Sequence, residues 1–171
     1  MGGPSSAPLV WRARQTSQSG KPPLHAVHEW VMPTERAAPP GRKRILIVED
    51  HELNMKLLND LLEAHGYDIL LARDGTTALR LARQQAPDLI LMDIQLPDIS
   101  GLEATRLLKA DRETSAIPIV AVTAFAMAGD RERTLESGCD AYVAKPIMIR
   151  EFLALIEQMV GSGEHPDSRP V

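Results

Sequence analysis

Five short apolar segments alternate with five amphipathic segments between residues 44 and 160, and this alternation constrains the fold more than any other feature of the sequence. Short apolar runs between turns are typical of buried strands, whereas apolar residues spaced three and four apart are typical of helices. We expect strands at 44–48, 67–72, 88–93, 117–123 and 141–145. We expect helices at 52–65, 74–85, 102–112, 129–137 and 149–160.

Strands that alternate with helices through short loops are typical of a parallel sheet covered by helices on both faces. Right-handed crossovers leave few topologies, and the flavodoxin-like strand order 2-1-3-4-5 is common for this pattern. We therefore expect an α/β, doubly wound (βα)5 fold with a five-stranded parallel sheet. In such a sheet the functional site lies beyond the carboxyl ends of the strands, where the strand order reverses.

Charged and hydroxyl side chains stand at those carboxyl ends. The first strand leads into Glu49 and Asp50, the third ends in Asp93, the fourth in Thr123 and the fifth in Lys145. Three carboxylates brought together repel one another and require a cation, and ligands that are all oxygen favour Mg²⁺ over zinc. Asp93 could then attack a phosphoryl group as a nucleophile. Mg²⁺ and Lys145 would neutralise the phosphoryl oxygens, and Thr123 could donate a hydrogen bond to one of them.

Several segments at these strand ends resemble the response-regulator receiver family, over about residues 44–160. They are ILIVED (45–50), LILMDIQLPDISG (89–101), VAVTAFA (120–126) and CDAYVAKPI (139–147). Within the family, residues 48–68 and 92–109 are most similar to single-domain regulators of cell division. The resemblance implies a phosphorelay protein that takes a phosphoryl group from a sensor histidine kinase. It would act through phosphorylation-dependent binding of downstream signalling proteins, in control of the cell cycle.

The resemblance also implies roles for the acidic residues. Asp93 would be the phosphoacceptor, and Mg²⁺ would be held by Glu49, Asp50, Asp93 and the backbone carbonyl of Gln95. The family often has Asp where this sequence has Glu49, and the retained charge should preserve metal binding. His51 stands where the cell-division regulators favour Asn, and we expect it to tune the site.

Further roles follow from the resemblance for residues of the last two strands. Lys145 would contact the phosphoryl group, and Thr123 would move toward it. Tyr142 would turn inward as the second switch residue. The peptide bond between Lys145 and Pro146 is expected to be cis, which a bond before proline permits at modest cost.

The first predicted helix has two neighbouring apolar rows, at about 100° of rotation per residue. The row that we expect to face the core consists of Leu53, Leu57 and Leu61. The row on its flank consists of Met55, Leu58 and Leu62. Either the helix is packed deeply, or the flanking row is an exposed strip that docks a kinase. The resemblance favours docking, with Pro146 and Ile147 beside this strip.

The ends of the chain differ in composition from the alternating region. Residues 1–43 hold 7 of the 13 prolines and six Lys/Arg against two Asp/Glu, whereas residues 44–171 hold 13 Lys/Arg against 21 Asp/Glu. We expect 1–43 to be a basic, disordered leader and 161–171 to be a flexible tail. A short docking segment at 25–32, or a later start at Met32, are the alternatives for the leader.

Other observations narrow the class of protein. No apolar run reaches the roughly 20 residues of a membrane span, and the first residues lack the layout of a signal peptide. The single Cys139 cannot form an internal disulfide, which fits a cytoplasmic protein. The acidic domain is a poor match to nucleic acid. With no output domain expected after residue 160, we expect a monomer that acts by binding proteins.

Two other interpretations compete with the receiver. A phosphatase of the haloacid dehalogenase kind would need a second Asp two residues after the nucleophile, as general acid, and this position is Gln95. A flavodoxin-like cofactor binder would need a phosphate-binding loop where the sequence has acidic residues 49–52. We therefore expect that the protein is not an enzyme. Its only reactions would be its own phosphorylation and slow dephosphorylation at Asp93. Within the receiver interpretation, an adaptor and a phosphate shuttle or sink both stay open.

Overall fold

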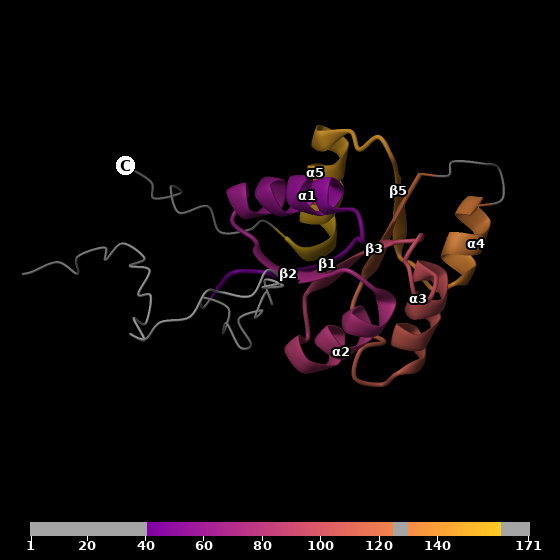
Figure 1. The fold of residues 1–171 in the computed structure, drawn as a ribbon. Helices are drawn as coiled ribbons and strands as arrows, with labels where there is room; N and C mark the ends of the chain where they lie inside the picture. Colours follow the sequence, from indigo (N-terminus) through magenta and orange to yellow (C-terminus); the bar gives the residue numbers. More distant parts are fainter. Residues whose placement is uncertain (1–40, 125–129, 162–171) are drawn as a thin grey trace, which may run out of the picture. The chain divides into compact units, whose positions relative to one another are not determined.

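The computed structural model describes residues 41–124 and 130–161, which alternate between strands and helices (Figure 1). The elements are β1 (Arg44–Val48), α1 (Glu52–Ala64), β2 (Asp68–Ala72), α2 (Gly75–Gln85), β3 (Leu89–Asp93), α3 (Gly101–Ala110), β4 (Ile119–Thr123), α4 (Asp130–Glu136), β5 (Ala141–Ala144) and α5 (Ile149–Val160). The predicted elements are confirmed, with ends that shift by at most two residues. The predicted leader up to residue 40, the predicted tail from residue 162 and residue 129 lie outside the described residues.

The strands form one parallel sheet in the order β2-β1-β3-β4-β5, as the sequence predicted. Val48 at the end of β1 pairs with Ala72 of β2 and with Met92 of β3, and Asp93 pairs with Val122 of β4. Because the strands are parallel and in register, their carboxyl ends meet at one edge of the sheet. The strand order reverses between β1 and β3, which makes the carboxyl edge there the expected place for a site.

Helices cover both faces of the sheet (Figure 1). On one face α1 and α5 enclose a core that includes Ile45, Ile47, Leu58, Leu62, Phe152 and Ile156. On the other face α2 and α3 enclose a core that includes Leu46, Val48, Ala78, Ala82, Ala104 and Leu108. Successive residues of β1 point into opposite layers, as the two-residue period of a strand requires. This explains why its residues are apolar throughout instead of alternating with polar ones.

The packing of α1 contradicts the predicted roles of its two apolar rows. The buried row, at most 5% exposed, consists of Met55, Leu58 and Leu62. By contrast Leu53 is 72% exposed and Leu57 55% exposed, and Leu61 is only partly buried. The prediction that Leu53, Leu57 and Leu61 face the core is therefore wrong, and so is the exposed docking strip of Met55, Leu58 and Leu62. The reason is tertiary: α1 shares its layer with α5, and Leu58 and Leu62 pack in one cluster with Phe152 and Ile156.

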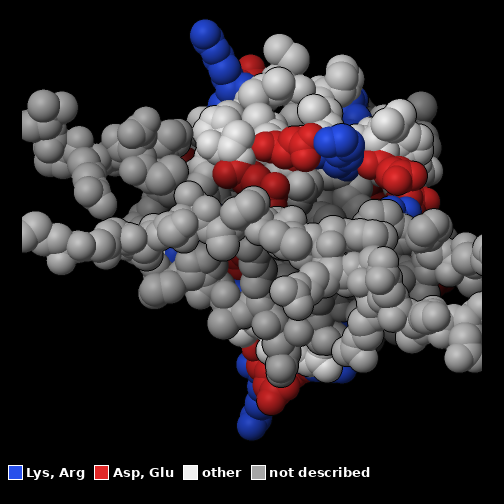
Figure 2. All heavy atoms as spheres, turned by 60° about the vertical axis from the view of Figure 1, so that its left-hand side comes forward, with Lys and Arg blue, Asp and Glu red and all other residues white. Residues whose placement is uncertain are grey.

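Both ends of the described domain lie at the amino edge of the sheet, opposite the carboxyl edge (Figure 1). At the start of β1, the guanidinium of Arg44 donates hydrogen bonds to Asp68 (2.7 Å) and Gln85 (3.0 Å). After α5, the carbonyl of Gly161 accepts a hydrogen bond from the hydroxyl of the buried Tyr67 (3.1 Å). In Figure 2, acidic and basic side chains lie next to one another instead of in large patches of one sign. Among the described residues, no helix has the length and apolarity needed to cross a bilayer.

Candidate functional site

Three carboxylates converge at the carboxyl edge between β1 and β3. Glu49 and Asp50 directly follow β1, Asp93 ends β3, and the pairing of these two strands brings the side chains together. One oxygen from each carboxylate lies within 4.8 Å of the others. Glu49 is 1% exposed and Asp93 5% exposed, whereas Asp50 faces solvent. This all-oxygen donor set fits Mg²⁺, which prefers carboxylate ligands together with water.

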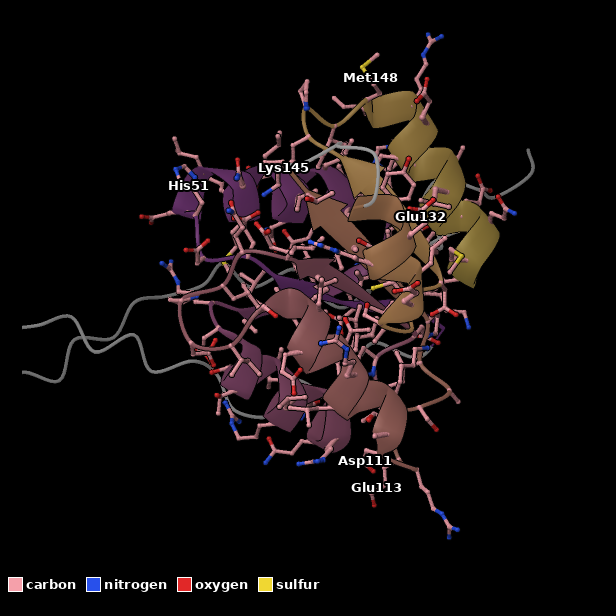
Figure 3. The ribbon with its side chains drawn as sticks, turned by 90° about the vertical axis from the view of Figure 1, so that its right-hand side faces the viewer. His51, Asp111, Glu113, Glu132, Lys145 and Met148 are labelled. Carbon is pink, nitrogen blue, oxygen red and sulfur yellow. The ribbon has the colours of Figure 1, made fainter. Side chains whose placement is uncertain are left out.

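Lys145 bridges the two buried carboxylates. Its Nζ donates hydrogen bonds to Asp93 Oδ2 (2.7 Å) and Glu49 Oε2 (2.8 Å). Burial alone would lower the pKa of Lys145, but the hydrogen bonds and charges of Asp93 and Glu49 outweigh it and raise that pKa. Lys145 is therefore kept as an ammonium beside Asp93. Figure 3 labels Lys145 and His51, which lie on the same side of the domain.

Backbone N–H groups hold the other oxygens of the same carboxylates. The N–H of Gln95 donates to Asp93 Oδ1 (2.9 Å), and the N–H of His51 donates to Glu49 Oε1 (3.1 Å). Each buried carboxylate thus has one oxygen on Lys145 and the other on the backbone. Buried charges need such partners, and the arrangement fixes the direction in which Asp93 points.

Thr123 and Tyr142, the two predicted switch residues, come from the neighbouring strands β4 and β5. Thr123 is 3% exposed at the end of β4, and its carbonyl accepts a hydrogen bond from the N–H of Lys145 (2.7 Å). Tyr142 pairs with Ala121 across the sheet and is 37% exposed. The structure thus places Thr123 next to the residue that contacts Asp93. The predicted movement of Thr123 toward a phosphoryl group stays a prediction, and residues 125–129 of the loop after it lie outside the described residues.

Gly101 allows the start of α3 to approach Asp93 closely. A Cβ atom at position 101 would lie 1.9 Å from the carbonyl oxygen of Asp93, so a larger residue cannot fit without a backbone shift. The N–H of Gly101 donates to the carbonyl of Ile94 (2.9 Å), and the N–H of Ile94 donates to the carbonyl of Val122 (3.3 Å). Gly101 was not among the site residues predicted from the sequence. Its signal was a glycine directly after Ser100 at a helix start, where close backbone approach is a common reason for glycine.

The predicted docking residues divide between the interior and the surface. Met55, Leu58 and Leu62 are buried in the core, so they cannot form a docking strip. The bond between Lys145 and Pro146 is cis, as predicted. Pro146 is exposed and Ile147 partly buried. Exposed apolar side chains on α1 and at the start of α5 are those of Leu53 (72% exposed), Leu57 (55%), Met148 (63%) and Ile149 (50%).

Comparison with known proteins identifies the family. Residues 45–157 match the response regulator receiver domain, and the chain belongs to this family. Proteins called polar-differentiation response regulator DivK, from Brucella ovis and Brucella melitensis, are 56% identical over 119 residues, which cover 70% of this chain and 97% of theirs. The predicted likeness to a single-domain cell-division regulator is confirmed.

Solved structures agree with this assignment. The receiver domain of the sensor histidine kinase PA1611 from Pseudomonas aeruginosa is 39% identical, with a TM-score of 0.66 over 71% of this chain and 99% of that one. That structure has a magnesium ion coordinated in its active site cleft. A CheY-like receiver domain protein from Methanospirillum hungatei is 30% identical, with a TM-score of 0.65 over 70% of this chain and 94% of that one. The fold is that of a receiver domain.

Proposed function

We propose that this chain is a single-domain response regulator that accepts a phosphoryl group on Asp93 from a sensor histidine kinase. The observation that carries the proposal is the surroundings of Asp93. This buried carboxylate lies within 4.8 Å of two others, and the Lys145 ammonium is 2.7 Å from one of its oxygens. A nucleophile, acidic metal ligands and a fixed cation are the parts that phosphoryl transfer to a carboxylate requires.

The transfer follows from these positions. Oδ2 of Asp93 attacks phosphorus while the bond from phosphorus to the kinase histidine breaks, and its electron pair leaves with the imidazole, which takes up a proton. Glu49, Asp50, Asp93 and the carbonyl of Gln95 would hold Mg²⁺. When bound, Mg²⁺ neutralises the phosphoryl oxygens and orients them for in-line attack.

Lys145 and Thr123 connect the modification to the rest of the domain. A phosphoryl group adds negative charge and acceptor oxygens at Asp93. Lys145 moves its hydrogen bond from the carboxylate to a phosphoryl oxygen, and Thr123 donates to another. Tyr142 then turns inward, and the surface of α4, β5 and α5 changes. This is a shift between two populations, and it requires that the phosphoryl group favour one of them.

Kinase docking uses the exposed apolar side chains at the carboxyl edge. Leu53 and Leu57 lie in the first two turns of α1, and Met148 and Ile149 lie at the start of α5, next to the exposed Pro146. Because α1 and α5 cover the same face of the sheet and both begin at its carboxyl edge, these side chains lie on one side of Asp93. Exposed apolar groups beside a reacting residue are suited to binding another protein. A helical bundle that carries the phosphohistidine would bring its phosphoryl group to Asp93.

The cellular role rests on the relatives. Their name links them to polar differentiation, and the match covers 97% of their length. We propose that the phosphorylated form acts as an adaptor in cell-cycle control, by binding downstream regulators. A phosphate shuttle or sink is the second candidate, because it needs the same chemistry and no adaptor surface.

A labelling experiment tests the phosphoacceptor. Wild type and Asp93→Asn are incubated with acetyl phosphate, with Mg²⁺ or with EDTA, and intact masses are compared before and after hydroxylamine. We expect wild type with Mg²⁺ to gain one phosphoryl group that hydroxylamine removes, and Asp93→Asn to gain none. Folded wild type that gains nothing, or that turns over phosphate esters, would contradict the proposal.

A second experiment tests docking. Phosphotransfer from a panel of autophosphorylated histidine kinases is measured for wild type, Leu57→Asp and Leu107→Asp. Leu107 is a matched control, because it is an apolar residue of α3 that is 42% exposed. We expect Leu57→Asp to slow transfer by about tenfold or more, as for a central interface residue, with acetyl phosphate labelling unchanged. Equal slowing by Leu107→Asp would mean that the α1 surface is not the docking site.

A further inference from the structure

Asp98 joins the loop after β3 to the start of α2. Its Oδ1 accepts a hydrogen bond from the N–H of Gly75 (2.8 Å). Its Oδ2 accepts two more, from the N–H (2.8 Å) and the hydroxyl (2.7 Å) of Thr76. These partners are separated by more than 20 residues in sequence and meet only because β2 and β3 end at the same edge of the sheet.

The start of α2 already has a cap of its own. Asp74 accepts hydrogen bonds from the N–H (2.6 Å) and the hydroxyl (3.0 Å) of Thr77. The first N–H groups of a helix lack partners within it, and carboxylates there interact favourably with the helix dipole. Asp98 supplies the partners of the two preceding N–H groups from a distant part of the chain. The contact therefore fixes the loop that carries Asp98 as well as the helix.

The loop of residues 94–100 is held at three places. At its start the backbone of Ile94 is hydrogen-bonded to Val122 and Gly101, and at its end Gly101 packs against the carbonyl of Asp93. Between them lies the contact of Asp98 with α2. Gly75 makes room there, because a Cβ atom at position 75 would lie 2.4 Å from Cγ1 of Ile99. The loop and α2 are thus packed tightly together at Gly75.

This loop also carries Gln95, whose backbone lies against the carboxylate cluster. The N–H of Gln95 donates to Asp93 Oδ1 (2.9 Å), and Asp98 follows three residues later. A loop that is free before a cation arrives must be ordered when the cation binds, at a cost in conformational entropy. A loop that is already held avoids this cost.

We propose that Asp98 is a positioning residue of the metal site. By tying the loop of residues 94–100 to α2, it holds the backbone of Gln95 ready to contact Mg²⁺ and so raises the affinity for the ion. The inference rests on the proposed function, because it takes Gln95 and the carboxylate cluster as the Mg²⁺ ligands.

The test is a Mg²⁺ titration of the full chain, followed by the amide NMR shifts of residues near the cluster. Asp98→Asn keeps the size of the side chain but turns an NH₂ group toward the donors of Gly75 or Thr76. We expect its Kd for Mg²⁺ to rise by about tenfold, the lower end of the range seen when supporting partners of metal ligands are removed. Asp98→Glu keeps the carboxylate and should recover part of the affinity.

Asp74→Asn is the matched control. It removes the same charge near the carboxyl edge and weakens the cap of the same helix, but it does not touch the loop. We expect its Kd to change by less than about twofold, since Asp74 acts on the cluster only through its charge, which salt screens in part. Shifts of distant residues show whether each variant is folded. If Asp98→Asn does not fold, Thr76→Val, which removes one hydrogen bond only, should still raise the Kd.

The Kd values distinguish the positioning role of Asp98 from an effect of charge or helix capping. Affinity equal to wild type in folded Asp98→Asn, or in Thr76→Val if that variant takes its place, overturns the positioning role. An equal loss of Mg²⁺ affinity in Asp74→Asn would also overturn the positioning role, because it would assign the effect to charge or to capping of α2. If wild type itself shows no binding of Mg²⁺, the proposed function fails, and the positioning role fails with it.

Discussion

The Nζ of Lys145 lies 2.7 Å from Asp93 and 2.8 Å from Glu49, so one ammonium bridges two buried carboxylates from different strands. Asp50 adds a third carboxylate within 4.8 Å. One positive charge therefore faces three negative ones. This excess of negative charge is suited to attracting a divalent cation.

Replacing Lys145 by Met should destabilise the domain when no metal is present. The change leaves Glu49 and Asp93 buried without their cation, and breaking a buried pair in this way costs about 3 kcal/mol. Mg²⁺ should restore more stability to the variant than to wild type, because it neutralises the same carboxylates. Urea unfolding with EDTA and with excess Mg²⁺ measures both effects. Lys56→Met, at an exposed ion pair with Asp60, is the control and should change little. A loss that Mg²⁺ does not reduce would contradict this account of the site.

The orientation of α1 predicts opposite results for two adjacent leucines. Leu58 is 2% exposed, so Leu58→Ala should lower the free energy of unfolding by about 3 kcal/mol. Leu57 is 55% exposed, so Leu57→Ala should change it by no more than about 0.5 kcal/mol. Urea denaturation of both variants provides the comparison. A larger loss for Leu57→Ala than for Leu58→Ala would mean that Leu57 faces the core, as the sequence suggested.

Gly101→Ala should damage the domain and the site together. The new Cβ atom would meet the carbonyl of Asp93, and backbone cannot turn aside as a side chain can. We expect a loss of about 3 kcal/mol, at the upper end for overpacking, and weaker labelling by acetyl phosphate. Gly75→Ala is the control, because its Cβ atom would meet the side chain of Ile99, and a side chain can shift more readily than backbone. A smaller loss for Gly101→Ala than for Gly75→Ala would show that α3 can move away from Asp93.

The contribution of Asp98 to stability should depend on pH. Its hydrogen bond from the Thr76 hydroxyl, followed by those from the backbone, outweighs desolvation and holds the pKa of Asp98 well below the usual 3.8. A depressed pKa in the folded state adds stability that is fully present above the unfolded value and is lost as pH falls toward the folded one. The difference in unfolding free energy between wild type and Asp98→Asn should thus be constant above about pH 5 and shrink below about pH 4. Urea unfolding of both proteins, from below about pH 4 up to pH 7, measures this difference in free energy. A difference that is the same at every pH would rule out the linkage.

Sequence alone predicted the strand order and the meeting of Glu49, Asp93 and Lys145. This worked because buried parallel strands are apolar throughout, and because the carboxyl ends of such strands share one edge of the sheet. The start of α2 was also predicted to within one residue, and Asp74, a residue type that is common at helix starts, caps it.

The orientation of α1 and the contacts of Asp98 could not be read in the same way. Helix α1 carries two apolar rows, and only its packing with α5 decides that Leu58 and not Leu57 turns inward. Asp98 looks like an ordinary loop residue, because its partner Thr76 is 22 positions earlier in the chain. Interactions between distant segments depend on the assembled fold, and the pattern around each residue does not contain them.

The hydrogen bond from Tyr67 to Gly161 has a practical consequence for attachment. Together with Arg44 at the start of β1, it places the entry and the exit of the domain on the side away from Asp93. A fused protein, an affinity tag or a sensor surface joined at either end would therefore leave the reacting edge accessible. The domain can therefore be tethered as bait for proteins that dock at the carboxyl edge, without covering Asp93.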